Sequence, residues 1–390
     1  MTLQDAVRFF TEESGTMACL HAACGSLTEL HTAMGGVRDA AGAPLAADSI
    51  FDLASLTKLF TGLTVYRLWE EGLLDLNARV TDYDARFVNL AGVTVDQLLG
   101  FEVALSTPGR LDAQPDRANA LPLLWQIAPG ENGRRPYSDM HAMVLKYVIE
   151  SAAGEGWLEA VAGRILRPLG MKNTWVRVPE EQRYRCVSCD REHRLVQGRH
   201  ILREGIAPGT PHDPKARLLN PDGEDCCGHA GMFSTMEDMV RLCRGILSGA
   251  VIGRESLRRM SRNRTGHPLP EGGWSQFLGS QCYVKHPDQY FSEVPAYMGP
   301  SAIALSGFTG HHLSVDPEQG IFALFLGNRV LNRLTFLIPE EGKEITDYGL
   351  NPDGTGRYLW PDGEWVRSSV HYVHLKDGHF HPAVAETMKL

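Results

Sequence analysis

The chain has 390 residues, a formal net charge of −9 at pH 7, and 43% hydrophobic and 22% charged residues. This length holds one large domain or two of ordinary size, and the composition is that of a globular protein. The negative charge argues against a general nucleic-acid or anionic-membrane binder, because binding to a polyanion favours basic proteins. Residues 1–13 look like an amphipathic helix without the apolar core of a signal peptide, and no stretch is apolar over a membrane span, so we expect a cytoplasmic location.

The predicted elements fall into three groups along the chain. Two strands, at residues 17–24 and 27–34, form a hairpin. Residues 74–215 are mostly helical and loop-like, with helices expected at 95–99, 120–127, 140–153 and 157–166, and an extended loop over 178–225. Helices at 235–247 and 255–260 follow, and then strands at 281–284, 302–306, 313–315 and 321–326. This order predicts an α+β fold, with an antiparallel sheet flanked by helices and an inserted, mostly helical domain.

The stretch from Phe51 to Lys58 leads into an apolar-periodic run, residues 59–73, that predicts a buried helix with Ser55 in its first turn. Ser55 and Lys58 then lie one turn apart on the same face. A serine hydroxyl needs help to attack, and an amine one turn away can take its proton if burial keeps that amine neutral. Free N–H groups at the helix N-terminus could stabilise an oxyanion. The alternative is a helix-capping serine followed by a solvated lysine, because the Ser-x-x-Lys pattern also arises by chance.

Two further stretches carry candidate residues. Tyr137 stands just ahead of the helix expected at 140–153, where it could move a proton between the serine and a leaving group. The alternative for this stretch is a helix-capping Ser-Asp pair, with Tyr137 packed as an ordinary aromatic residue. The strand at 302–306 runs into Gly307 and Phe308, where a ligand could approach the backbone and an N–H could supply a second oxyanion donor. The alternative here is a simple hairpin end.

In this order, the Ser-x-x-Lys, Tyr-Ser-Asp and glycine-containing stretches resemble the class C β-lactamase-like serine hydrolases, a family that includes esterases, D-stereospecific peptidases and acyltransferases. Residues 167–171, 212–213, 228–235 and 327–329 also look like landmarks of that family. The resemblance covers roughly residues 15–335. It implies the β-lactamase and D,D-peptidase fold, with a sheet domain (1–75 and 216–390), a mostly helical domain (76–215) and the active site between them.

The resemblance also implies roles for individual residues. Ser55 would be the acylated nucleophile, Lys58 its proton-accepting partner, and Tyr137 the base or acid at the leaving group. The backbone N–H groups of Ser55 and Phe308 would form the oxyanion hole. Asp139 would hold Lys58 by a charge-assisted hydrogen bond.

Two departures from the family pattern bear on the substrate. Where β-lactamases and D,D-peptidases have Lys-Thr-Gly and many esterase-like members have His-Thr-Gly, this chain has Leu305-Ser306-Gly307. Leucine offers apolar contact where a cation would hold a substrate carboxylate, so we expect neither β-lactams nor D-Ala-D-Ala peptides as substrates. Phe101 stands where the family commonly has histidine, which predicts a more apolar or reshaped entrance to the cleft.

The cysteines and the tail carry weaker signals. Cys186, Cys189, Cys226 and Cys227 could give four thiolates to zinc, but their spacing is not that of a standard zinc module, so reduced structural thiols are the expectation. His371, His374, His379 and His381 are expected at the surface, because no carboxylate or thiolate partner stands at helical spacing.

We therefore predict a serine hydrolase that cleaves an ester or amide through an acyl-enzyme on Ser55, with a neutral or partly apolar small-molecule substrate. No metal, organic cofactor, nucleic acid or membrane is expected to take part, and the oligomeric state is open. The first alternative is an acyltransferase, in which an alcohol or amine takes the acyl group from Ser55. The second is a non-catalytic binding protein on the same fold.

Overall fold

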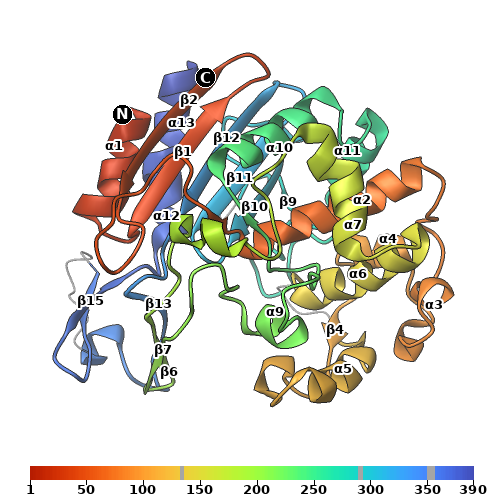
Figure 1. Cartoon of the computed structure of the whole chain (residues 1–390), viewed down its shortest axis with the longest axis horizontal. Helices are drawn as coiled ribbons and strands as arrows, with labels where there is room; N and C mark the ends of the chain where they lie inside the picture. Colours follow the sequence, from red (N-terminus) through yellow and green to blue (C-terminus); the bar gives the residue numbers. More distant parts are fainter. Residues whose placement is uncertain (132–135, 289–292, 349–355) are drawn as a thin grey trace.

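A six-stranded antiparallel sheet forms the centre of the computed structural model, which describes residues 1–131, 136–288, 293–348 and 356–390 (Figure 1). The strand order is β2-β1-β12-β11-β10-β9. These strands span Leu30–Gly36 (β2), Cys19–Gly25 (β1), Ile321–Gly327 (β12), His311–Asp316 (β11), Ile303–Gly307 (β10) and Tyr283–Val284 (β9). Strands β1, β11 and β12 are buried along their whole length, whereas β2 alternates as an edge strand should.

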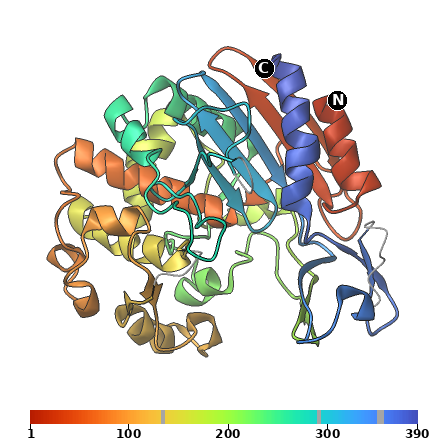
Figure 2. The same cartoon turned by 180° about the vertical axis from the view of Figure 1, so that it is seen from behind.

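Helices cover both faces of this sheet. Helices α2 (Thr57–Glu70), α10 (Met236–Ser248) and α11 (Arg254–Met260) lie on one face, and α1 (Leu3–Arg8), α12 (Tyr372–Leu375) and α13 (His381–Met388) on the other. Figure 2 shows α1 and α13 side by side across the back of the sheet. Successive residues of β12 serve the two layers: Leu324 and Leu326 join the core with α2 and α10, and Ala323 and Phe325 join the core with α1 and α13.

The chain between β3 and β6 is mostly helical. It contains α3 (Val80–Tyr83), α4 (Val95–Leu99), α5 (Arg117–Trp125), α6 (Asp139–Ala153), α7 (Trp157–Val161) and α8 (Arg167–Leu169). Ser138 caps the start of α6, and Gly154 ends it in a left-handed conformation. Helix α2 is buried on nearly every side because α6 packs against it on the side away from the sheet. Two short pairs, β3 (Phe51–Asp52) with β8 (Phe233–Ser234) and β4 (Leu105–Ser106) with β5 (Ala128–Pro129), tie loops to these layers.

The expected extended loop over 178–225 contains a hairpin and a helix instead. Strands β6 (Glu192–Val196) and β7 (Arg199–Arg203) are joined by Gln197 and Gly198, both at positive φ, and α9 (Pro214–Leu219) follows. The hairpin extends a second sheet in the order β14-β15-β13-β6-β7, which includes β13 (Arg333–Ile338), β14 (Arg357–Leu359) and β15 (Trp365–Ser368). The segment is rich in polar and arginine residues, and β7 has no buried residue, so the apolar alternation that marks a strand is weak here.

The α+β class and the antiparallel sheet flanked by helices are confirmed. The proposed domain boundaries stay a prediction. Among the described residues, no helix is both long and apolar enough to span a bilayer. In the tail, His371 and His374 are exposed as expected, whereas His381 is buried under the sheet.

Candidate active site

Ser55 lies in a strained turn between β3 and α2. The chain leaves β3 and turns at Ala54, which has φ +45° although it is not a glycine. The buried Asp52 carboxylate accepts the Ala54 N–H at 2.9 Å and fixes this turn. Ser55 follows in a single 3₁₀ turn, Ala54–Leu56, so it stands one turn ahead of α2 rather than inside it. The hydroxyl is thereby presented at the start of a buried helix.

Lys58 is the immediate partner of Ser55. Its side chain has no exposed surface, and its Nζ lies 2.9 Å from Ser55 Oγ, 2.7 Å from Asp139 Oδ1 and 3.3 Å from the carbonyl oxygen of His229. Burial alone would lower the pKa of Lys58, but interactions with Asp139 and Tyr137 outweigh it and raise the pKa above the ordinary 10.5. Lys58 is therefore an ammonium ion at neutral pH and donates to the serine oxygen.

Tyr137 completes the predicted catalytic group. Its ring centroid is 5.0 Å from Lys58 Nζ. The ring is stacked between those of Phe101 (5.4 Å) and Tyr283 (5.6 Å), and its backbone N–H donates to Gln276 Oε1. This aromatic stack fixes the plane of the tyrosine while leaving the residue half-exposed.

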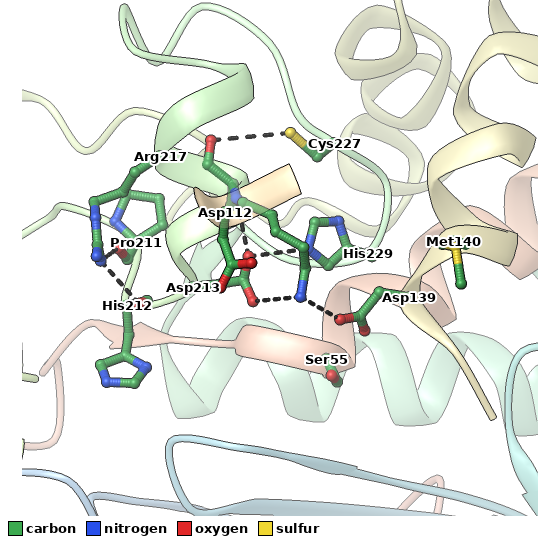
Figure 3. A network of polar contacts seen from close by, with 12 residues as sticks. Ser55, Asp112, Asp139, Met140, Pro211, His212, Asp213, Arg217, Cys227 and His229 are labelled. Atoms are coloured by element: carbon green, nitrogen blue, oxygen red, sulfur yellow. Dashed lines mark hydrogen bonds and ion pairs between the residues drawn. The ribbon is translucent and has the colours of Figure 1, made fainter. Parts of the chain in front are cut away.

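Asp139 starts α6 and joins Lys58 to a second lysine that sequence reasoning missed. Its other oxygen, Oδ2, lies 2.7 Å from Lys215 Nζ, and Lys215 is in turn 3.5 Å from Asp213 Oδ2. Asp213 Oδ1 pairs with His229 Nε2 at 3.0 Å. Figure 3 shows Asp139, Asp213 and His229 gathered beside Ser55. Burial would raise the pKa of Asp139, but the charges of Lys58, His229 and Lys215 hold it well below the ordinary value.

Local sequence features explain how this network is assembled. Asp213 is the N-cap of α9, which carries Lys215 in its first turn. Gly228 lies against α6, where a Cβ would come within 2.5 Å of the Ala142 carbonyl oxygen, and its own carbonyl accepts the Thr61 hydroxyl of α2. The sequence did single out Asp213, Gly228 and His229, since 212–213 and 228–235 match family landmarks. It did not indicate that these residues belong to the site.

Asp139, Asp213 and His229 are also close enough to share a metal ion. The Lys215 ammonium already lies between the two carboxylates, so the group has a cation of its own. Cys186, Cys189, Cys226 and Cys227 are all buried and unpaired. Within the described ranges, no cysteine belongs to a group close enough to hold a metal.

The end of β10 packs directly against the nucleophile turn. A Cβ at Gly307 would come within 2.8 Å of the Leu53 carbonyl oxygen, so the close neighbour that requires glycine is this backbone. Thr309 Oγ1 and His311 Nε2 both lie within hydrogen-bond distance of the Asp52 carbonyl oxygen, at 2.8 and 2.6 Å. In the part of the chain that the structure describes, the backbone N–H groups of Ser55 and Phe308 have no acceptor, which leaves both available to a ligand.

Three residues that we expected to contact the substrate have side chains that face other parts of the protein. Leu305 is fully buried in the core between the sheet and α2. Ser306 points to the opposite face of β10, because side chains alternate along a strand, and donates to Glu293 Oε2 at 2.7 Å. Phe101 is fully buried with φ +59° and contacts Tyr137 rather than the solvent of the cleft.

Comparison with known proteins gives a consistent result. The model of the Beta-lactamase family matches residues 22–336. A Salmonella enteritidis PT4 protein described as "Putative D-alanyl-D-alanine carboxypeptidase" is 25% identical over 315 residues, which cover 72% of this chain and 70% of that protein. The structure of "EstCE1, a hydrolase with promiscuous acyltransferase activity" has a TM-score of 0.65 at 19% identity and covers 84% of this chain and 92% of its own. Simvastatin synthase (LOVD) from Aspergillus terreus has a TM-score of 0.61 at 16% identity and covers 83% and 88%.

Proposed function

This chain belongs to the Beta-lactamase family, and we propose that it is a serine hydrolase that cleaves an ester or amide through an acyl-enzyme on Ser55. The observation that carries the proposal is the contact of Ser55 Oγ with the buried Lys58 ammonium, at 2.9 Å, beside Tyr137. The Asp139 carboxylate already pairs with the charge of the buried lysine. The lysine therefore does not need the half-exposed Ser55 hydroxyl to satisfy its charge, and this favours a catalytic role for the contact.

The raised pKa of Lys58 determines how we divide the proton transfer. A lysine that accepts the serine proton must be neutral, whereas Lys58 beside Asp139 is charged. In this proposal Lys58 stabilises the developing charge on Ser55 Oγ. Tyr137, acting as a phenolate, takes the serine proton as the new bond to the carbonyl carbon forms, and passes it to the leaving group as the old bond breaks. The N–H groups of Ser55 and Phe308 stabilise the carbonyl oxygen.

The substrate in this proposal is neutral or partly apolar at the scissile bond, rather than a β-lactam. Leu305 replaces the cation that would hold a carboxylate next to that bond. Leu305 and Phe101 are both buried, however, so neither side chain contacts the substrate. They therefore do not determine the charge of the parts of the substrate that lie further from the scissile bond.

Transfer of the acyl group to an alcohol or amine is the alternative outcome of the same acyl-enzyme. It needs no further catalytic residue, because Tyr137 can activate an alcohol as it would activate water. The choice depends on which acceptor reaches the acyl-enzyme first. The location proposed for the protein is the cytoplasm, and its acyl donor is a small molecule.

The proposal is tested by the intact mass of the protein after exposure to a fluorophosphonate. Wild type should gain one adduct, Ser55→Ala none, and Ser26→Ala, which changes a half-buried serine in the turn of the first hairpin, one adduct as in wild type. Turnover of short- and medium-chain nitrophenyl esters, with and without added alcohol, then separates hydrolysis from transfer. An unmodified wild type without ester turnover would contradict the proposal and favour a binding protein.

A further inference from the structure

Four arginines gather beside the end of β10 around a buried carboxylate. Glu192, the first residue of β6, is fully buried, and it is the carboxylate that Arg194 and Arg203 approach. Two further arginines next to this group donate to neutral oxygens: Arg217 to the carbonyls of Pro211 and His212, and Arg329 to the Thr335 carbonyl and the Ser369 hydroxyl. Buried charges are normally paired, so a guanidinium in this group that lacks a hydrogen-bond acceptor is a candidate for binding an anion.

The Glu192 carboxylate is already fully used. Its Oε1 accepts Arg194 Nε at 2.7 Å and also the Thr335 hydroxyl, and its Oε2 lies 3.0 Å from His212 Nε2. Burial would raise the pKa of Glu192, but the hydrogen bond and charge of His212 and the contact with Arg194 lower it to about 2. Glu192 therefore stays ionised and is committed to partners other than Arg203.

Arg203 is left as the guanidinium with unused hydrogen-bonding capacity. Its nearest approach to a carboxylate is 3.9 Å, from Nη1 to Glu192 Oε2, which is too long for a hydrogen bond. Among the residues that the structure describes, no acceptor lies within hydrogen-bond distance of it. Its side chain is 28% exposed and that of Arg194 is 16% exposed, so both can be reached by a ligand.

His212 connects this group to the proposed reaction centre. Its ring stacks on that of Phe308 at 5.4 Å, and its backbone N–H donates to the Asp52 carboxylate that fixes the nucleophile turn. The Asp112 carboxylate is an electrostatic neighbour of both Arg203 and Lys215, and Lys215 contacts Asp139. Arg203 and the Ser55 network therefore border the same region of the molecule.

We infer that Arg203, with Arg194 beside it, binds a carboxylate at the far end of the substrate whose ester or amide carbonyl reacts at Ser55. The planar guanidinium fork suits a carboxylate, and its partial burial makes the pairing stronger than at an open surface. This inference rests on the proposed function, and it specifies the substrate class as a neutral acyl bond carried by an acid. The carboxylate would then lie beside the hairpin of β6 and β7, which carries Arg194 and Arg203.

Paired substrates test this inference. The 4-nitrophenyl monoesters of succinic, glutaric and adipic acid carry a terminal carboxylate, and the butyrate, valerate and hexanoate esters have the same chain lengths without it. The readout is the ratio of kcat/KM for the acidic ester to that for the neutral ester in wild type, Arg203→Leu, Arg203→Lys and Arg199→Leu. Arg199 starts the same strand, is exposed and has no ion pair among the described residues, so its variant removes an equal charge elsewhere.

We expect a ratio above one in wild type for at least one chain length. Arg203→Leu should lower it about tenfold or more, Arg203→Lys less, and Arg199→Leu should leave it unchanged. A wild type that prefers the neutral ester at every length, or a ratio that Arg203→Leu leaves unchanged, overturns the inference.

A calorimetric titration of Ser55→Ala with glutarate, in the presence and absence of the Arg203→Leu change, separates the two proposals. If no ester is turned over but glutarate binds through Arg203, the carboxylate site stands and the serine hydrolase does not. If esters are turned over without a preference for acids and glutarate does not bind, the hydrolase stands and the carboxylate site does not.

Discussion

Asp139 Oδ1 lies 2.7 Å from Lys58 Nζ, and the lysine side chain has no exposed surface. This contact sets the charge of the residue next to Ser55, because the carboxylate outweighs the burial that would otherwise favour a neutral amine. Since Asp139 also contacts Lys215, one aspartate lies between two lysines.

Asp139→Asn should shift the pH dependence of the reaction. In wild type the pKa of Lys58 lies above 10.5, so the ammonium persists across the neutral and mildly alkaline range. Without the carboxylate, burial lowers that pKa, and the alkaline limb of the kcat/KM profile should move to lower pH by about one unit or more. The control is Asp116→Asn at the exposed N-cap of α5, where asparagine caps equally well. An alkaline limb that stays in place in Asp139→Asn would mean that the charge of Lys58 is not required.

Tyr137→Phe should reduce kcat without reducing stability. The variant keeps the ring stacked between Phe101 and Tyr283 and removes only the oxygen that we propose carries the proton. We expect kcat to fall by about 10²–10⁴ with a small change in KM. Tyr184→Phe, at a side chain that is 70% exposed, is the matched control and should behave as wild type. Near-normal kcat in Tyr137→Phe would assign the proton transfer to another group.

The parts of the site that the sequence predicted are those set by short spacing. Ser55 and Lys58 are three residues apart, so a helical start brings them together whatever the rest of the fold does. Tyr137 and Asp139 needed the resemblance to a known family, because more than 80 residues of chain separate them from Ser55 and local pattern carries no information on that contact. Lys215 was missed for the same reason: α9 is short, polar and lies inside a segment expected to be a loop.

Other differences between the prediction and the structure concern the direction in which single side chains point. Leu305 was expected at the cleft because its family counterpart contacts substrate, but an apolar side chain on that face of β10 joins the core against α2. The turn at Ala54 had no sequence signal, since alanine rarely takes positive φ, and tertiary contacts of Asp52 impose it.

Glu192 should make the protein sensitive to acid. Its pKa of about 2 in the folded state lies below the ordinary 4.5, so its contribution to stability is complete above pH 4.5 and is lost as pH falls toward 2. This difference corresponds to about 3 kcal/mol of unfolding free energy at neutral pH, of which about 2 kcal/mol is lost by pH 3. Urea unfolding at pH 7, 5 and 3 should show that Glu192→Gln is less stable than wild type at pH 7 and loses less on acidification. Glu341→Gln, at an exposed site, should follow the wild-type slope, and equal slopes in all three proteins would exclude this origin of acid sensitivity.

Lys376 should be required for stability although it lies beyond the matched residues 22–336. Its fully buried Nζ is 2.8 Å from Glu293 Oε2, and the same carboxylate oxygen accepts the hydroxyl of Ser306 on β10. Burial would raise the pKa of Glu293, but Lys376 and His312 lower it, so removing the lysine leaves a buried carboxylate without its main partner.

Lys376→Met should therefore cost about 3 kcal/mol in the free energy of unfolding, measured by urea titration. Adding Glu293→Gln should recover part of this loss, because the double variant buries no unpaired charge. Lys343→Met, which breaks an exposed pair with Glu340, should change stability little, since solvent screens that pair. A double variant as unstable as the sum of the single changes would show that the two residues act independently. Recovery would instead show that a buried ion pair joins the tail to Glu293, which also accepts the hydroxyl of Ser306 on β10, so that the tail belongs to the scaffold of the site.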